Sequence, residues 1–258
     1  MLINFSLVPV EKIRPWGTPG AYRLHWFGLT DGEYWIQAGE AALFEHSDDA
    51  QTAGAGRYCD YQVVRLYEDL MEMLPYILEP IPKSLTQYIC GETANAWQKT
   101  CNTWCDKSYD VLESSRFDET YNAAVAWTGK RWLDSAYLSP SANIAIWSDE
   151  EYVHIEWDNR DRRFNGKPAW SAILGSYKMP RNEFIKEMKS FHLRLMEQMA
   201  TRVIQAEKGA LAPGIEIDLP CLVKEQERRI RTLDTSLNLC PKTDWKEVEK
   251  AIREIREA

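Results

Sequence analysis

One stretch near the start of the chain, residues 24–39, constrains the fold most, because two runs rich in aromatic residues flank an Asp-Gly step. Asp31 and Gly32 predict a tight turn, since glycine readily adopts the positive φ that short hairpin turns require. Rings such as Trp26 and Trp35 favour half-buried strands. The stretch therefore predicts a β-hairpin, and its bulky side chains indicate that helices or a partner cover both faces.

Further β-structure is indicated at three other places. Residues 142–157 predict a second hairpin of similar aromatic content, with a charged turn at 148–150. Alternating apolar residues predict a first strand at 2–8 and a third strand beside the second hairpin at 169–177. The simplest arrangement is one antiparallel sheet that contains both hairpins.

Helical periodicity accounts for much of the remaining chain, because apolar side chains recur there every three to four residues. Six segments follow this pattern: 60–78, 92–114, 118–134, 181–207, 218–238 and 245–258. Pro75 lies inside the first segment and is expected to kink or end it. Pro241 separates the last two segments, which we expect to pack as an antiparallel pair.

These elements predict an α+β fold, with an antiparallel sheet built from two aromatic-rich hairpins and covered by about six helices. No low-complexity linker divides the 258 residues, so we expect a single domain over residues 1–258. A sub-boundary, if one exists, lies near residues 135–142, where Pro140 and several serines cluster.

The formal net charge of −8 argues against a dedicated nucleic-acid-binding protein, which needs a clustered basic surface. An acidic surface suits a cytoplasmic protein, or one that recognises a basic protein partner. The first residues lack the basic start and long apolar run of a signal peptide, and no stretch has the length of a membrane helix. We therefore expect a cytoplasmic protein that contacts neither membrane nor nucleic acid.

Motifs for metal, cofactor or nucleophile chemistry are missing from the sequence. The six cysteines include no C-x-x-C pair, so no metal site is predicted and reduced thiols are expected. No Gly-x-Ser-x-Gly motif marks a nucleophile, and no cofactor is predicted.

Two sets of residues on the predicted hairpins are nevertheless candidates for a site. Glu156 and Asp158 lie two apart, hence on one strand face, as paired carboxyl groups for sugar hydrolysis could. The catalytic candidates are His25, Asp31, His154, Glu156 and Asp158. The candidate binding residues are Trp26, Trp35, Trp157 and Trp170, whose rings are equally suited to a core. Any such site is expected where the two hairpins meet.

Five motifs are spread along the chain. They are Pro15-Trp16-Gly17, the run Leu24-His25-Trp26-Phe27-Gly28-Leu29-Thr30-Asp31-Gly32, residues 60–70, residues 184–199, and Thr243-Asp244-Trp245. Together they resemble an uncharacterised bacterial domain family over nearly the whole chain, with residues 91–117 least typical. This resemblance implies a bacterial, cytoplasmic, single-domain protein. It transfers no catalytic residues, because the family has no established activity.

Two functions follow from these observations. The first is a bacterial binding protein, similar to immunity or antitoxin proteins by analogy, that recognises a toxin or effector protein through an acidic, tryptophan-rich surface. The alternative is a hydrolase that acts on a sugar or a nucleotide, with a carboxylate and histidine site between the hairpins. Because no catalytic motif is present, binding is the expected function and catalysis the alternative.

Overall fold

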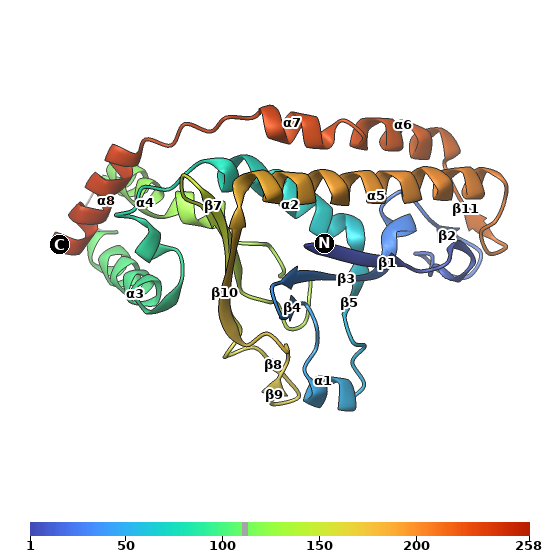
Figure 1. Cartoon of the computed structure of the whole chain (residues 1–258), viewed down its shortest axis with the longest axis horizontal. Helices are drawn as coiled ribbons and strands as arrows, with labels where there is room; N and C mark the ends of the chain where they lie inside the picture. The colour runs from blue at the N-terminus through green and yellow to red at the C-terminus, as the bar shows by residue number, and fades with distance from the viewer. Residues whose placement is uncertain (110–112) are drawn as a thin grey trace.

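The computed structural model describes residues 1–109 and 113–258. Residues 110–112, which fall within the predicted helix 92–114, lie outside the described residues. The fold is α+β with antiparallel sheets, as predicted. Figure 1 shows a long helix, α5 (Arg181–Glu207), running over the strands of the two larger sheets, with further helices at one end of the molecule.

The first sheet forms around β3 (Asp31–Ala38). This strand pairs antiparallel with β1 (Ile3–Leu7), β4 (Ala41–Leu43) and β5 (Cys59–Gln62). The strand predicted at residues 2–8 is therefore confirmed. The hairpin predicted at 24–39 is wrong in its first half: the short strand β2 (Tyr22–Arg23) ends before it, residues 24–27 belong to no strand, and Gly28–Thr30 forms a 3-10 turn, η2.

Two contacts explain why the first hairpin does not form. Trp26 is fully buried, and its Nε1 donates a hydrogen bond of 2.7 Å to Gln226, 200 residues later. Gly32 lies against β1 and not in a turn, since a Cβ there would lie 2.3 Å from the carbonyl oxygen of Ser6. Gly32 thus allows β1 and β3 to approach closely; besides turns, close backbone approach is a common reason for glycine in β-structure.

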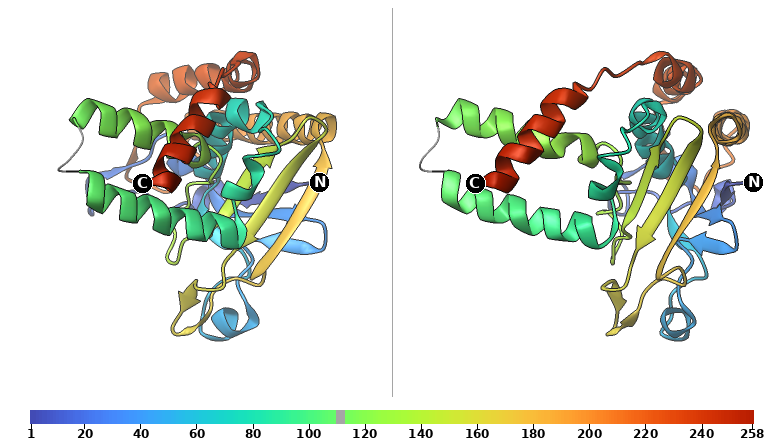
Figure 2. Two further views of the ribbon diagram at one scale, coloured as in Figure 1. Left: turned by 90° about the vertical axis from the view of Figure 1, so that its left-hand side faces the viewer. Right: turned by 60° about the vertical axis from the view of Figure 1, so that its left-hand side comes forward.

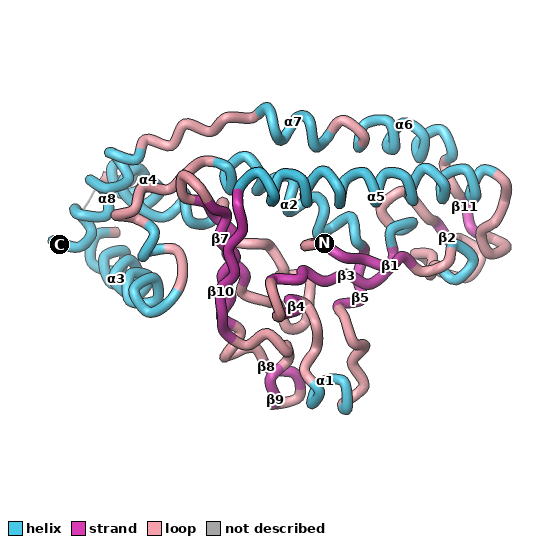
Figure 3. Tube along the Cα trace, viewed as in Figure 1, coloured by secondary structure: helices cyan, strands magenta, loops and turns pink. Residues whose placement is uncertain are grey.

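The second sheet has the order β10-β7-β6, with β6 (Ile144–Ser148), β7 (Tyr152–Asp158) and β10 (Leu174–Pro180) all antiparallel. The second hairpin is confirmed, and the third strand begins five residues later than predicted. The two predicted hairpins do not share one sheet, because β3 is already paired on both sides. Figure 3 shows the two groups of strands side by side beneath α5.

Most helices occur where the periodicity predicts them. The bounds are α1 (Asp48–Thr52), α2 (Val63–Leu78), α3 (Gly91–Ser108), α4 (Ser114–Gly129), α5 (Arg181–Glu207), α6 (Leu219–Arg229), α7 (Thr232–Asn238) and α8 (Trp245–Glu257). The segment predicted at 218–238 is divided into α6 and α7. Pro75 lies inside α2 and does not end it. The start of α2 is capped from a distance, since Thr30 Oγ1 accepts a hydrogen bond from the amide of Val64 at 3.2 Å.

Two cores hold the fold together. The main core lies between both sheets and the helices α2 and α5, and includes Ile36, Leu70, Ile155 and Phe191. The second core contains side chains of α3, α4 and α8, and it packs on the other face of the second sheet through Trp147. Figure 2 shows these three helices beside that sheet.

The last helix does not form the predicted antiparallel pair with its predecessor. Helix α8 packs on α4 and α3, whereas α7 packs on α2. An extended segment joins α7 to α8 across the molecule (Figure 1). The apolar face of α8, with Val248, Ile252 and Ile255 buried, is therefore used to build the second core. None of the described helices is both long and apolar enough to span a membrane.

Candidate functional site

The candidate site is the face of β7 that points away from the main core. Val153, Ile155 and Trp157 alternate along β7 and are buried in the main core. The intervening side chains of His154, Glu156 and Asp158 lie on the opposite face and are half-buried. The strand period of two therefore brings together three of the five catalytic candidates.

His154 is held at one end of this face by two contacts. Its ring stacks on Trp147 of β6, with centroids 4.1 Å apart and an interplanar angle of 8°. Its Nε2 lies 2.8 Å from Oδ2 of Asp149. Although burial acts to raise the pKa of Asp149, hydrogen bonds from the amides of Tyr152 and Glu151 and from His154 lower it. An ionised Asp149 therefore orders the turn between β6 and β7.

Glu156 occupies the middle of the face. Burial raises the pKa of Glu156. Burial, with the charge of Glu156 nearby, raises the pKa of Cys90 at the start of α3 to about 11. Cys90 is thus a thiol at neutral pH, which excludes it as a thiolate nucleophile.

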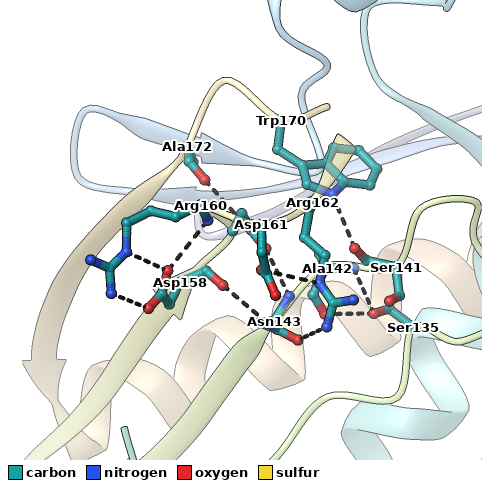
Figure 4. Close-up of polar contacts among 11 residues, drawn as sticks. Ser135, Ser141, Ala142, Asn143, Asp158, Arg160, Asp161, Arg162, Trp170 and Ala172 are labelled. Atoms are coloured by element: carbon teal, nitrogen blue, oxygen red, sulfur yellow. Dashed lines mark hydrogen bonds and ion pairs between the residues drawn. The ribbon is translucent and has the colours of Figure 1, made fainter. Parts of the chain in front are cut away.

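Asp158 lies at the other end and has the opposite electrostatic environment. Arg160 donates hydrogen bonds of 2.9 and 2.7 Å to its two oxygens (Figure 4), and these lower the pKa of Asp158. Beside this pair, Asn143 accepts a hydrogen bond from Arg162 and donates one to the carbonyl of Asp158. The buried side chain of Asn159 accepts a hydrogen bond of 2.8 Å from the backbone amide of Asn143, which fixes the end of the strand.

Two grooves adjoin this face. The larger, about 870 Å³, lies between the loop after α2, the β6–β7 turn and the start of α8, and we call it the aromatic groove. Its lining includes Pro82, Trp147, Glu150, Glu151, Tyr152 and Trp245. The smaller, about 390 Å³, lies at the Asp158 end. It includes Cys90, Asn95, Trp132, Asn143, Asp158 and Arg160.

The other two catalytic candidates lie elsewhere. His25 is exposed in the loop after β2, where its ring packs on Trp16 with centroids 4.3 Å apart. Asp31 begins β3 in the first sheet. Figure 1 shows β2 and β7 toward opposite ends of the molecule. The site expected between the two hairpins is therefore not assembled, because the two strand groups belong to separate sheets.

Three of the four candidate binding tryptophans are buried. Trp26, Trp157 and Trp170 are at most 5% exposed and lie in the main core. Arg229 lies 4.3 Å above the ring of Trp26, which adds a cation–π contact to that burial. Trp35 is half-buried and stacks on Tyr58, with centroids 4.0 Å apart. These rings therefore do not form one surface patch.

The sequence does not indicate that the residues lining the aromatic groove lie together. Trp147 and Tyr152 belong to the predicted second hairpin, and Trp245 follows the Thr243-Asp244 cap. The local pattern thus places each of these residues in its own element. Their meeting depends on α8 packing against α4, which no local pattern indicates.

Within the described residues, no group of three or more His, Cys, Asp or Glu side chains is arranged to hold a metal ion. The model of a protein family described as "Family of unknown function (DUF5984)" matches residues 2–251. No curated protein and no solved structure matches the chain.

Proposed function

Because the chain belongs to the DUF5984 family, whose function is unknown, we propose a function from its geometry: it is a binding protein that recognises a protein partner. The observation that carries this proposal is the aromatic groove, which combines Trp147, Tyr152 and Trp245 with exposed carboxylates. Amphipathic rings in a concave surface are typical of binding hot spots. The proposal places the protein in the bacterial cytoplasm, with a toxin or effector as its partner.

The charges of the groove indicate the chemistry of the partner. Two of its carboxylates are engaged within the chain: Glu79 accepts hydrogen bonds from Arg131 and Thr243, and Asp149 accepts one from His154. Glu150 and Glu151, at the β6–β7 turn, are exposed. The lysines Lys83 and Lys178 also line the groove, and Nζ of Lys178 lies 4.7 Å from the centre of the Tyr152 ring. We therefore expect Glu150 and Glu151 to receive a basic side chain of the partner, and the rings of Trp147 and Trp245 to receive an apolar side chain beside it.

A charge-reversal experiment tests this proposal. The double variant Glu150→Lys, Glu151→Lys reverses the exposed charges without removing a hydrogen bond made by either side chain among the described residues. The matched control is Glu197→Lys, Glu207→Lys, on the exposed side of α5. In a pull-down from the native host at low salt, the wild type and the control should retain a stoichiometric partner, and the groove variant should lose about tenfold in affinity or more.

A partner retained equally by all three proteins, or no stoichiometric partner at low salt, would overturn the proposal. If the chain acts like an immunity protein, its partner must be toxic. Expressed alone, the partner should arrest growth, and co-expression of the wild-type chain should restore it.

A second candidate function is hydrolysis of a sugar or a nucleotide, and one observation favours it. Glu156 and Asp158 share a strand face, roughly 7 Å apart between Cα atoms, and their pKa values move in opposite directions. Such divergence suits a protonated general acid beside an ionised base. Of the two carboxylates only Asp158 lines the smaller groove, where Trp132 and Asn95 would contact the substrate.

The test is release of reducing sugar from a panel of oligosaccharides, and of phosphate or base from nucleotides. Hydrolysis by the wild type should fall about 10²–10⁴-fold in Glu156→Gln, because a general acid contributes that much. Glu197→Gln is the control and should keep full activity. Absence of hydrolysis by the wild type across both panels rejects this second function.

A further inference from the structure

A further cleft lies on α2, and its lining shares Trp132 with the smaller groove of the β7 face. It has a volume of about 390 Å³ and is formed by α2 and the segment that follows α4. Carboxylates of Glu68, Asp69, Glu72 and Asp134 line it, together with the cations Arg65 and Lys130. Met73, Gly129 and Trp132 complete the lining. We refer to it as the Asp69 cleft.

Asp69 is the unusual member of this cleft, because its side chain is only 9% exposed and is incompletely bonded. Its Oδ2 atom is buried and has no hydrogen-bond partner among the residues that the structure describes. Its Oδ1 atom lies 3.6 Å from Nη2 of Arg65, which instead donates a hydrogen bond of 3.0 Å to Asp134. Buried carboxylates are normally paired or hydrogen-bonded, so a donor is missing at Asp69.

The charges that face Asp69 favour a cation as that donor. From α2 these are Arg65, Glu68 and Glu72, and from the facing segment they are Lys130 and Asp134, beside the neutral phenol of Tyr137. Lys130 is directed elsewhere, with its Nζ 3.9 Å from Glu72 and over the ring of Tyr76. Carboxylates therefore outnumber cations in the lining, and neither resident cation satisfies Oδ2.

We infer that the Asp69 cleft binds a small organic molecule that carries a primary ammonium group, which donates a hydrogen bond to Asp69. An ammonium group has three donors, which suits a carboxylate cluster of this kind. The aliphatic part of the ligand lies against Met73 and the ring of Trp132, where a cation–π contact is also available. A divalent metal ion fits less well, since no metal-holding group occurs among the described residues.

Binding of such a ligand is coupled to the ionisation of Asp69. Burial raises the pKa of Asp69 to about 7; the charge of Arg65 opposes this rise, and the charges of Asp134, Glu68 and Glu72 add to it. Only the ionised carboxylate can accept the full charge-assisted bond. Affinity should therefore rise about tenfold from pH 6 to pH 8, as the ionised fraction rises, and binding at pH 7 should release about half a proton.

Isothermal titration calorimetry with cadaverine tests the inference, with pentan-1-ol as the uncharged probe. The wild type should bind cadaverine and not pentan-1-ol, and titrations in phosphate and Tris should reveal the released proton. Asp69→Asn keeps the shape of the side chain and should weaken binding at least about tenfold. Glu197→Gln, on the exposed side of α5, should bind like the wild type.

Two results would overturn the inference. One is the absence of cadaverine binding by the wild type at millimolar concentration between pH 6 and pH 8. The other is equal affinity in Asp69→Asn. The pH dependence of the wild type provides a readout that needs no variant, so a folding defect in Asp69→Asn would not hide the answer.

Discussion

The buried ion pair between Arg131 and Glu79 joins the two cores, and its removal is the most informative perturbation of the fold. Arg131 is fully buried, and its Nη2 donates a hydrogen bond of 3.0 Å to Glu79. Its Nη1 donates one of 2.6 Å to the carbonyl of Trp127. Glu79 also accepts hydrogen bonds of 2.7 Å from the amide and the hydroxyl of Thr243, which precedes α8.

The expected cost follows from what each substitution leaves behind. Removing one partner of a buried ion pair typically costs about 3–5 kcal/mol, because the remaining charge is uncompensated. In Arg131→Met, Glu79 keeps both bonds from Thr243, so we expect the lower end, about 3 kcal/mol. Burial lowers the pKa of Arg131, and the negative charge of Glu79 counteracts this effect. Glu79→Gln removes that charge and leaves a buried, unpaired guanidinium, so we expect a cost at the upper end of the range, about 5 kcal/mol.

The assay is urea unfolding at pH 7, followed by tryptophan fluorescence, for both single variants and for the double variant. The double variant removes both charges and should cost less than the sum of the single variants by more than about 1 kcal/mol. Arg116→Met is the control, because Arg116 forms an exposed pair with Glu254 at 2.9 Å and should cost about 1 kcal/mol or less. Additive effects, or a cost in Arg131→Met no larger than in the control, would refute the reasoning.

Three further predictions concern pH, packing and thiols. The pKa of Asp69 is higher in the folded state than in the unfolded state, so the folded state binds more protons and the free energy of unfolding should fall as pH rises. In urea unfolding, the free energy of unfolding of the wild type, measured relative to that of Asp69→Asn, should fall by about 3 kcal/mol between pH 5 and pH 8. Gly32→Ala should lower the unfolding free energy by about 1–3 kcal/mol, because its Cβ would meet the Ser6 carbonyl, and an unchanged urea midpoint would contradict this. In a thiol-labelling time course, exposed Cys240 should react within minutes and buried Cys59 only on unfolding; equal rates would contradict the fold.

Elements with a strong local period could be predicted from the sequence alone. Helix α5 spans the predicted residues 181–207, because its apolar side chains recur at helical spacing over 27 residues. Helix α8 begins at Trp245, the first residue of the predicted segment 245–258, and there the carboxylate of Asp244 accepts hydrogen bonds from the amides of Lys246 and Glu247. The position of Glu156 and Asp158 on one face of β7 also follows from a local period, because alternate residues of a strand point to the same side.

Where a short apolar run has a distant partner, only the tertiary structure decided the outcome. Residues 24–30 are as aromatic as a strand, yet Trp26 turns inward to Gln226, and Gly32 serves a strand contact in place of a turn. The same holds for the aromatic groove and the Asp69 cleft, whose walls are joined by contacts between segments far apart in the chain. Local sequence determines backbone propensity and which face of an element is apolar; which faces meet depends on packing free energies that arise only when the whole chain is folded.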